Sequence, residues 1–412
     1  MYPRHATQSI RTALADTPVV FVMGPRQVGK TTLVKALIAE MGEQDWTYIT
    51  LDDQAQFEVA RADPAGFIRN LPATRIALDE VQRLPELFVS IKQVVDEQRT
   101  PGRFLLTGSA NALLLPRLSD SLAGRMEIVR LMPLSECEII GNKSSFLSKL
   151  MNQEVPVTKN VRIRNHLLER VVAGCFPEPL QRDSEERMSA WYKQYLDTLV
   201  QRDVRDLSHI DYPERMIKLL KVAALHTGNL VNFTELASRL EINRETAKKY
   251  LALLEQLFLL ERLPAWHSNE HKRLVRASKL HLVDTGLTCA LRELSSKRLL
   301  KQPAEFGLLL ESFVFNELRK QSMWLEHRPH FYHYRDKDKA EVDIVIETPM
   351  RECFAVEVKA AATLNKQDFT GLKRLQQTAG SHFKIGVLLY DGDDTIPFGK
   401  NLYAVPHGAL WE

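Results

Sequence analysis

The sequence is poor in cysteine and has no long hydrophobic run. Only four of its 412 residues are cysteines, and they are scattered, at Cys137, Cys175, Cys289 and Cys353. Without a C-x-x-C pair they indicate neither a zinc site nor a disulfide framework, and they suit a reducing compartment. No apolar stretch approaches about 20 residues, the length that a membrane-spanning helix needs. Residues 1–5 lack the apolar core of a secretory signal, so we expect a cytoplasmic protein with no membrane partner.

The bulk composition leaves several function classes open. A chain of 412 residues, 44% of them hydrophobic, can hold about two to four domains with packed cores. The formal net charge of +3 argues neither for nor against a nucleic-acid partner. There is no internal repeat or low-complexity tract, so the motifs must identify the function.

A glycine-rich loop near the start of the chain is the most specific motif. The pattern G-x-x-x-x-G-K-[ST] of phosphate-binding loops, with one further threonine, is found at Gly24, Pro25, Arg26, Gln27, Val28, Gly29, Lys30, Thr31 and Thr32. An apolar run precedes it and a segment with helical spacing follows, as the motif requires. In this context Lys30 reaches the β- and γ-phosphates, and the Thr31 hydroxyl is a Mg²⁺ ligand. The sequence therefore predicts a site for ATP and Mg²⁺.

Two further apolar runs are expected to complete this site. The run 75–80 ends in Asp79, expected to hold the Mg²⁺ shell, and in Glu80, expected to orient and deprotonate the attacking water. The run 104–109 ends in hydroxyls where related ATPases carry a polar sensor of the γ-phosphate. Ser109 is the first candidate for the sensor and Thr107 the second. Without the loop upstream, these residues would be ordinary polar strand ends.

Phosphoryl transfer also gains from a cation placed on the developing charge. Arg125 follows a loop and is a candidate that would act within a ring of subunits. Arg202 and Arg205 are rivals for this role. Most arginines simply lie at surfaces, so the sequence names candidates without choosing among them.

The order of expected helices and strands predicts an α/β protein. Residues 141–160 are expected to form a loop or an insertion, and residues 161–212 to be helical with an interruption at Pro177 and Pro179. Four parts are predicted: a P-loop NTPase core with a parallel sheet, a linker with a helical lid, a winged helix-turn-helix, and a C-terminal α/β nuclease-like domain, at 1–140, 141–212, 213–290 and 291–412.

The third part has a helix-turn-helix pattern. Residues 232–240 form a short expected helix with Asn232 or Thr234 as its N-cap, a turn follows at 241–243, and a second helix covers 244–255. Between residues 239 and 279 there are nine Lys or Arg against five Asp or Glu, which suits contact with DNA phosphates. The candidate DNA contacts on the second helix are Arg244, Lys248 and Lys249. A winged helix that contacts only proteins is the alternative.

The fourth part carries the D…E-x-K pattern of metal-dependent nucleases. Side chains alternate along a strand, so Glu357 and Lys359 are expected on one face, and Asp343 on the preceding strand can face them. With Glu311 from a helix and the Val358 carbonyl, these carboxylates would hold Mg²⁺ or Mn²⁺, and Lys359 would assist a metal-bound water. Two alternatives stay open: a nuclease fold kept for structure or binding, and solvated edge charges.

Motifs spread over the whole chain resemble those of prokaryotic AAA-like P-loop ATPases that end in a domain of unknown function, DUF4143. The matching segments are 24–32, 78–82, 106–109, 122–125, 131–136, 279–287, 311–318, 341–343 and 356–359. The resemblance implies an ATP-binding core, a winged helix, a restriction-endonuclease-like domain and a homo-oligomer.

The favoured interpretation is an ATPase whose nucleotide state controls a DNA-contacting winged helix and a metal-dependent nuclease. In the main alternative, ATP acts as a conformational switch, the winged helix recognises DNA or a protein, and the C-terminal domain does no chemistry. A DNA-remodelling motor without cleavage is the third interpretation.

Overall fold

The computed structural model describes residues 2–109, 122–142, 146–157, 165–199, 213–273 and 276–411. Two of the arginine candidates, Arg202 and Arg205, lie outside these residues. The chain forms two compact units, residues 1–134 with 256–258, and residues 135–255 with 259–412. None of the helices in the described ranges is both long and apolar enough to cross a membrane.

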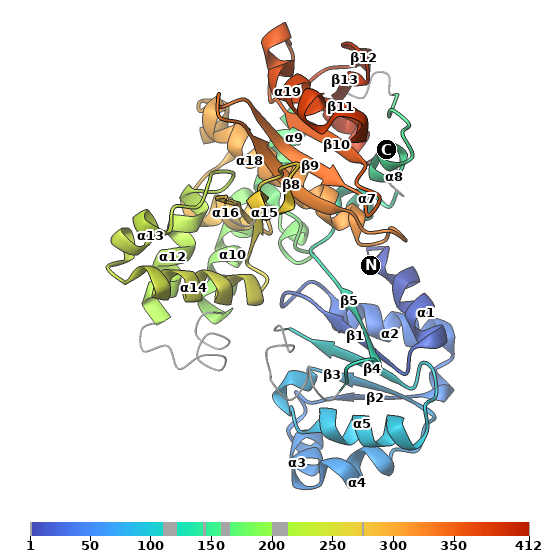
Figure 1. Ribbon diagram of the computed structural model, residues 1–412. Helices are drawn as coiled ribbons and strands as arrows, with labels where there is room; N and C mark the ends of the chain where they lie inside the picture. Colours follow the sequence, from blue (N-terminus) through green and yellow to red (C-terminus); the bar gives the residue numbers. More distant parts are fainter. Residues whose placement is uncertain are drawn as a thin grey trace. The chain divides into compact units, whose positions relative to one another are not determined.

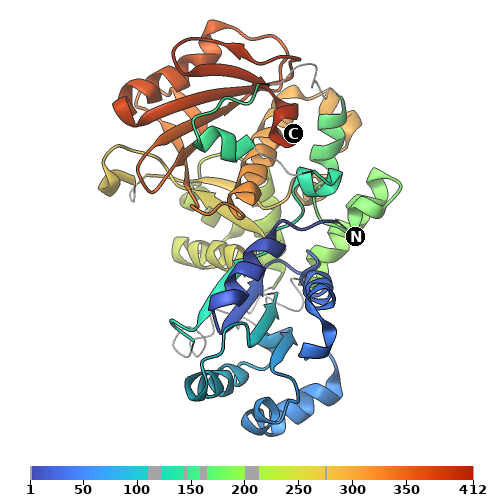
Figure 2. The same ribbon diagram turned by 90° about the vertical axis from the view of Figure 1, so that its right-hand side faces the viewer.

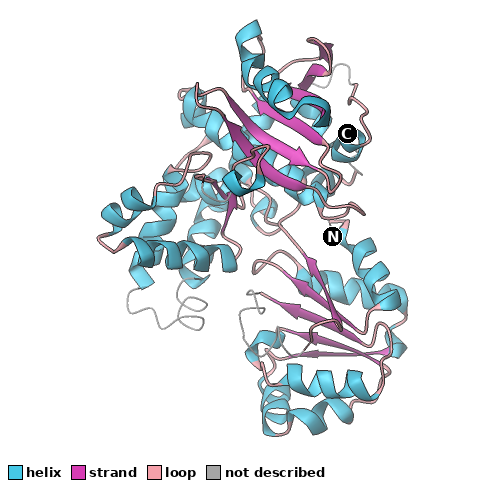
Figure 3. Cartoon of the chain, viewed as in Figure 1, coloured by secondary structure: helices cyan, strands magenta, loops and turns pink. Residues whose placement is uncertain are grey.

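The first unit is built on a five-stranded sheet in the order β2-β3-β4-β1-β5. All of its strands are parallel, and Figure 3 shows them as one layer with helices on both sides. The strands are β1 (Val19–Met23), β2 (Trp46–Thr50), β3 (Arg75–Asp79), β4 (Phe104–Gly108) and β5 (Met126–Arg130). The helices are α1 (Ala6–Asp16), α2 (Lys30–Met41), α3 (Gln54–Ala62), α4 (Pro64–Arg69) and α5 (Leu87–Glu97).

Burial explains why the strands of this sheet read as continuous apolar runs. Every residue of β1 and β4 is buried, as expected for central strands of a parallel sheet that is covered on both faces. The predicted α/β fold with a parallel sheet is therefore confirmed. Because β4 lies between β1 and β3, the residues that follow β4 emerge between the phosphate-binding loop and the acidic residues of β3.

The second unit begins with helices. These are α7 (Glu136–Ile140), α8 (Phe146–Met151), α9 (Asn165–Ala173), α10 (Glu185–Leu199), α12 (Pro213–Leu225), α13 (Phe233–Leu240), α14 (Arg244–Gln256), α15 (Glu270–Arg273), α16 (Thr285–Arg292) and α17 (Ser296–Leu300). Of the two alternatives for residues 141–160, a loop is wrong at α8, and an insertion stays a prediction. Phe146, Leu147 and Leu150 are buried in the same apolar cluster as Leu309, and this packing stabilises a helix that the polar neighbouring sequence does not indicate.

Helices α13 and α14 begin and end within one residue of the boundaries predicted from the sequence. Asn232 caps α13, because its Oδ1 accepts hydrogen bonds from the N–H groups of Thr234 and Glu235. The turn between α13 and α14 contains Glu241 with a left-handed φ of 54°. Two short antiparallel strands, β6 (Leu260–Leu263) and β7 (Lys279–Leu282), follow. Their identity as a winged helix-turn-helix stays a prediction.

A mixed six-stranded sheet ends the second unit, in orange to red in Figure 1 and Figure 2. Its order is β12-β13-β11-β10-β9-β8, with strands β8 (His330–Arg335), β9 (Glu341–Glu347), β10 (Cys353–Val358), β11 (Phe383–Tyr390), β12 (Ile396–Pro397) and β13 (Leu402–Pro406). Helix α18 (Pro303–Ser322) and helix α19 (Thr370–Ala379) pack on opposite faces. Phe354 and Val356 of β10 join the α18 cluster, whereas Cys353 and Ala355 join the α19 cluster.

The packing of α19 on β9 gives a stability test. A Cβ on Gly371, in the first turn of α19, would lie 1.7 Å from the Glu341 carbonyl oxygen. We therefore expect Gly371→Ala to lower the free energy of unfolding by about 1–3 kcal/mol through overpacking, measured by chemical denaturation. Gly307→Ala is the matched control, because nothing lies within 4 Å of a Cβ there. In helix α18 this change should stabilise by up to about 1 kcal/mol, and equal effects of the two substitutions would contradict the packing argument.

Candidate functional site

The phosphate-binding loop joins β1 to α2. Gly29 precedes the helix with a φ of 92°, a left-handed conformation that glycine adopts without a steric cost. The buried Lys30 side chain turns back over the loop, and its Nζ donates to the carbonyl oxygens of Gly24 (3.0 Å) and Pro25 (2.8 Å). The ammonium is thus held at the mouth of the loop, where the phosphates of a nucleotide would meet it.

The Asp79 carboxylate lies at the centre of the site and is only 4% exposed. Its Oδ2 accepts hydrogen bonds from the hydroxyls of Thr31 (2.8 Å) and Tyr48 (2.9 Å), and its Oδ1 accepts one from Thr107. Burial, followed by the charge of Asp79, raises the pKa of Tyr48 well above its usual range. The Thr31 hydroxyl and the Asp79 carboxylate therefore converge as oxygen ligands of the kind that Mg²⁺ prefers.

The Glu80 carboxylate belongs to a second polar group beside Asp79. Its Oε2 accepts a hydrogen bond from Gln82 Nε2 and one from Ser109 Oγ (3.3 Å), while Gln82 Nε2 lies 3.0 Å from Ser109 Oγ. Glu80 itself has a left-handed φ of 58°, a strained conformation typical of functional sites. Of the two sensor candidates, Ser109 contacts Glu80 and Thr107 contacts Asp79.

Three residues of this site had no role in the sequence analysis. Tyr48 reaches Asp79 from the neighbouring strand β2, and Gln82 links Glu80 to Ser109. Arg4 donates from Nη1 to the Val28 carbonyl in the loop (2.7 Å) and from Nη2 to the Met132 carbonyl (2.6 Å). Gln82 lies in the segment 78–82, one of the motifs that carry the family resemblance, so the sequence did indicate a role for it. The other two contacts join distant segments, and no local pattern indicates them.

Arg125 lies at the other end of the sheet. It immediately precedes β5, which runs parallel to β1. Arg125 therefore lies at the amino ends of the strands, whereas the phosphate-binding loop lies at their carboxyl ends. Its Nε lies 2.5 Å from Asp96 Oδ1, and its Nη1 donates to the Ala123 carbonyl. It does not reach the nucleotide site of its own sheet, and its role as an arginine finger toward another subunit stays a prediction.

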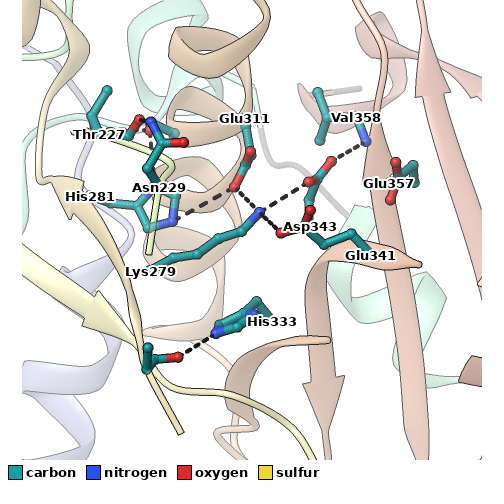
Figure 4. Close-up of polar contacts among 12 residues, drawn as sticks. Thr227, Asn229, Lys279, His281, Glu311, His333, Glu341, Asp343, Glu357 and Val358 are labelled. Carbon is teal, nitrogen blue, oxygen red and sulfur yellow. Dashed lines mark hydrogen bonds and ion pairs between the residues drawn. The ribbon is translucent and has the colours of Figure 1, made fainter. Parts of the chain in front are cut away.

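The acidic residues of the C-terminal region surround a lysine (Figure 4). Lys279 Nζ lies 2.8 Å from Glu311 Oε1, 3.2 Å from Asp343 Oδ1 and 3.7 Å from Glu341 Oε1. Lys279 is the first residue of β7 and is 3% exposed. Burial alone would lower its pKa, but the charges of Asp343 and Glu311 outweigh burial and raise the pKa above its usual value. The lysine is therefore held as a buried cation.

The expected metal ligands form ion pairs with two different lysines: Glu311 and Asp343 with Lys279, and Glu357 with Lys359. Asp343 Oδ2 accepts the Val358 N–H (3.0 Å), and Glu357 Oε1 lies 3.1 Å from Lys359 Nζ. Burial, followed by the charge of Asp343, raises the pKa of Glu357 to about 8. Within the described parts of the chain, no three His, Cys, Asp or Glu side chains are grouped so that they could hold a metal ion. The predicted set of Glu311, Asp343 and Glu357 does not fit a divalent metal in this arrangement.

Several of the basic side chains near α14 are paired with acidic side chains, and one of them is buried. Arg244 and Lys249 are exposed, and Lys248 Nζ lies 2.8 Å from Glu245 Oε1. Four others among the nine counted between 239 and 279 are ion-paired: Arg239, Arg262, Arg273 and Lys279. Lys279 is also buried, so it adds nothing to a surface that contacts DNA phosphates.

Models of known protein families match three parts of the chain. Residues 16–140 match the family model described as an AAA domain, and residues 306–410 match a domain of unknown function, DUF4143. Between them, residues 164–298 match another domain of unknown function, DUF8612. Through these matches the chain is similar to AAA-like P-loop ATPases that carry a C-terminal DUF4143 domain. The resemblance stated from the sequence motifs is thereby confirmed.

The relatives of this AAA-like chain extend over most of its length. An uncharacterized protein of Mycobacterium tuberculosis is 29% identical over 406 residues, which cover 98% of this chain and 83% of the relative. An uncharacterized protein of Methanocaldococcus jannaschii is 23% identical, over 85% of this chain and 76% of its own. Among solved structures, a Walker-type ATPase of Pyrococcus abyssi is 14% identical with a TM-score of 0.42, covering 71% of this chain and 96% of that chain.

The buried histidines of the C-terminal region predict a pH dependence of stability. Burial lowers the pKa of His407 from 6.5 to about 4, although its Nε2 contacts the Lys359 carbonyl oxygen. As the pH falls from 6.5 toward 4, the unfolded chain takes up this proton and the folded chain does not. The free energy of unfolding should therefore fall, by up to about 1.4 kcal/mol per pH unit for such a histidine. Denaturation from pH 7 to pH 4 should show a shallower loss in His407→Gln than in the parent.

The exposed His382 provides the control for this measurement. His382→Gln should leave the pH dependence of stability unchanged. If His407→Gln and the parent lose stability equally between pH 7 and pH 4, the proton uptake is not at His407.

Proposed function

We propose that this chain binds ATP with Mg²⁺ and hydrolyses it. The observation that supports the proposal best is the convergence of Thr31, Asp79, Glu80 and Ser109 at one edge of the parallel sheet, beside Lys30. The loop and the acidic strand are 48 residues apart in sequence at the contact of Thr31 with Asp79. A chance glycine turn would not bring these groups together.

The residues have distinct roles in this proposal. Lys30 would bind the β- and γ-phosphates, and Thr31 and Asp79 would hold Mg²⁺, which would supply positive charge beside the phosphates. Glu80 orients a water molecule and accepts its proton as the water oxygen attacks the γ-phosphorus and the bond to ADP breaks. Gln82 and Ser109 fix the direction of the Glu80 carboxylate. Through its hydrogen bond with Glu80, Ser109 would respond to the presence of the γ-phosphate.

Two substitutions test this assignment. Lys30→Ala should abolish or greatly weaken nucleotide binding, because the phosphates lose their cation. Glu80→Gln should bind ATP like the parent and hydrolyse it at least about 100-fold more slowly, since the base is lost while Mg²⁺ binding is kept. Binding is measured with a fluorescent ATP analogue and turnover by phosphate release. Glu43→Gln, an exposed change in the same unit, is the control, and a Glu80→Gln variant with the parent's turnover would remove Glu80 from the role of base.

DNA binding through a winged helix at 213–290 is the second element of the proposal. The turn at 241–243 between α13 and α14, and the antiparallel strands β6 and β7, support it. The exposed Arg244 and Lys249, with Lys248 beside them on α14, would contact phosphates. In this proposal, residues 141–212 form the helical lid, and the subunits assemble as homo-oligomers in which Arg125 of one acts on another.

A triple substitution tests the place of DNA binding. Changing Arg244, Lys248 and Lys249 to Ala should weaken DNA binding by at least about tenfold at moderate salt and flatten its salt dependence, because fewer counterions are released. Fluorescence anisotropy with duplex DNA at several salt concentrations measures both effects. The matched control changes Lys297, Arg298 and Lys301, three exposed basic residues elsewhere in the same unit. If both triple variants lose affinity equally, α14 is not the contact surface.

The C-terminal region allows two functions, of which one is favoured. Metal-dependent cleavage, with Lys359 beside a metal held by Glu311, Asp343 and Glu357, stays a prediction from the sequence. The contacts of Lys279 with Glu311 and Asp343 favour the alternative, an ATP-switched module that binds DNA or a protein while its nuclease-like domain does no chemistry. The restriction-endonuclease-like identity of this region is likewise part of the proposal.

A further inference from the structure

We propose that the Lys279 ammonium takes the place of a divalent metal in the acidic cluster of Glu311, Glu341 and Asp343. Lys279 lies before the region that matches DUF4143, at 306–410, and within the region that matches DUF8612, at 164–298. The middle of the chain thus supplies the cation that closes the acidic cluster of its C-terminal region. This inference concerns a site separate from the nucleotide site and does not depend on ATP hydrolysis or DNA binding.

The hydrogen bonds of the cluster leave little for a metal to bind. A lysine ammonium has three donors and no lone pair, so it competes with a metal for carboxylates and is never a ligand itself. Lys279 Nζ donates to Glu311 Oε1 and to Asp343 Oδ1. The other oxygen of Asp343 accepts the Val358 N–H. Both oxygens of the central aspartate are therefore engaged.

The positive charge of the Lys279 ammonium also disfavours a metal ion in this cluster. A metal in contact with both Glu311 and Asp343 would lie next to the ammonium, since Nζ is 2.8 Å and 3.2 Å from those carboxylates. Like charges so close together in a buried site repel strongly. Figure 4 shows the ammonium between the two carboxylates, with Glu357 on the far side of Asp343. Glu357 is paired with Lys359 instead.

The backbone holds Lys279 in this position. On one side, Lys279 pairs with Leu263 of β6, and on the other it forms an isolated bridge with Leu230. The next residue, Leu280, donates its N–H to the Asn229 carbonyl (3.0 Å) and accepts the Gly228 N–H (2.8 Å). With neighbours on both sides and 3% exposure, this lysine is a fixed part of the core, unlike a mobile surface side chain.

The ion pairs of Lys279 then join the region that matches DUF8612 to the region that matches DUF4143. Removing the ammonium leaves the buried carboxylate of Glu311 close to the partly buried carboxylate of Asp343. Their repulsion makes the site both less stable and receptive to a divalent cation. Lys279→Met keeps most of the side-chain volume and removes the charge. The substitution is therefore expected to convert a site that rejects metal into one that binds it.

Mn²⁺ binding to the full chain without nucleotide tests the inference. The signal of free Mn²⁺ in electron paramagnetic resonance measures how much ion is bound. The parent and Asp343→Asn should bind the same amount, because Asp343 holds no metal in the parent. Lys279→Met should gain about one Mn²⁺ per chain, and Lys279→Met/Asp343→Asn should lose it again. Mn²⁺ should also raise the Tm of Lys279→Met but not that of the parent.

Lys272→Met, a change at an exposed lysine of the same unit, is the control and should gain no Mn²⁺. Mn²⁺ binding by the parent that disappears in Asp343→Asn or Glu311→Gln would overturn the inference, and this comparison holds even if Lys279→Met does not fold. A folded Lys279→Met that gains no Mn²⁺ would overturn it as well. Neither outcome touches the proposed ATPase, whose turnover is measured separately in the same variants.

Discussion

A buried carboxylate needs a partner, and this constraint shapes the nucleotide site and the acidic cluster around Lys279. Removing a carboxylate from water is costly unless hydrogen bonds or an opposite charge compensate for it. Asp79 is compensated by three hydroxyls, from Thr31, Tyr48 and Thr107. Glu311 and Asp343 share one ammonium, that of Lys279, and Asp343 also accepts the Val358 N–H.

The kind of partner decides what each site can do. Hydroxyl donors leave the charge of Asp79 in place, so in the proposed function the carboxylate would still attract Mg²⁺ once a nucleotide brings its phosphates. An ammonium cancels one unit of charge and occupies the space between the acids. We thus expect a carboxylate to bind a divalent cation in the nucleotide site, whereas the ammonium prevents such binding in the cluster around Lys279. The polar groups around Glu80 follow the first pattern, with Gln82 and Ser109 as neutral partners.

Much of the nucleotide site was predictable because its parts are local. The strand, loop and helix at 19–41 are consecutive, and the acidic residues end an apolar run that is recognisable by itself. Strand alternation also placed Glu357 and Lys359 on one side, where they form an ion pair. The sequence failed at Lys279, which was counted among the basic residues of a DNA-binding surface. It failed at α8 too, where burial of Phe146 and Leu147 outweighs a polar neighbourhood.

The sequence by itself determined the phosphate-binding loop, the acidic strand end and the order of helices and strands, since each depends on residues close together in the chain. Only the tertiary structure decided the partners of the buried charges. Lys279 is 32 residues from Glu311 and 64 from Asp343, and Tyr48 is 31 from Asp79. Such pairs form because strands and helices bring distant residues into one dry interior, where each charge must find a partner, and no local spacing encodes that choice.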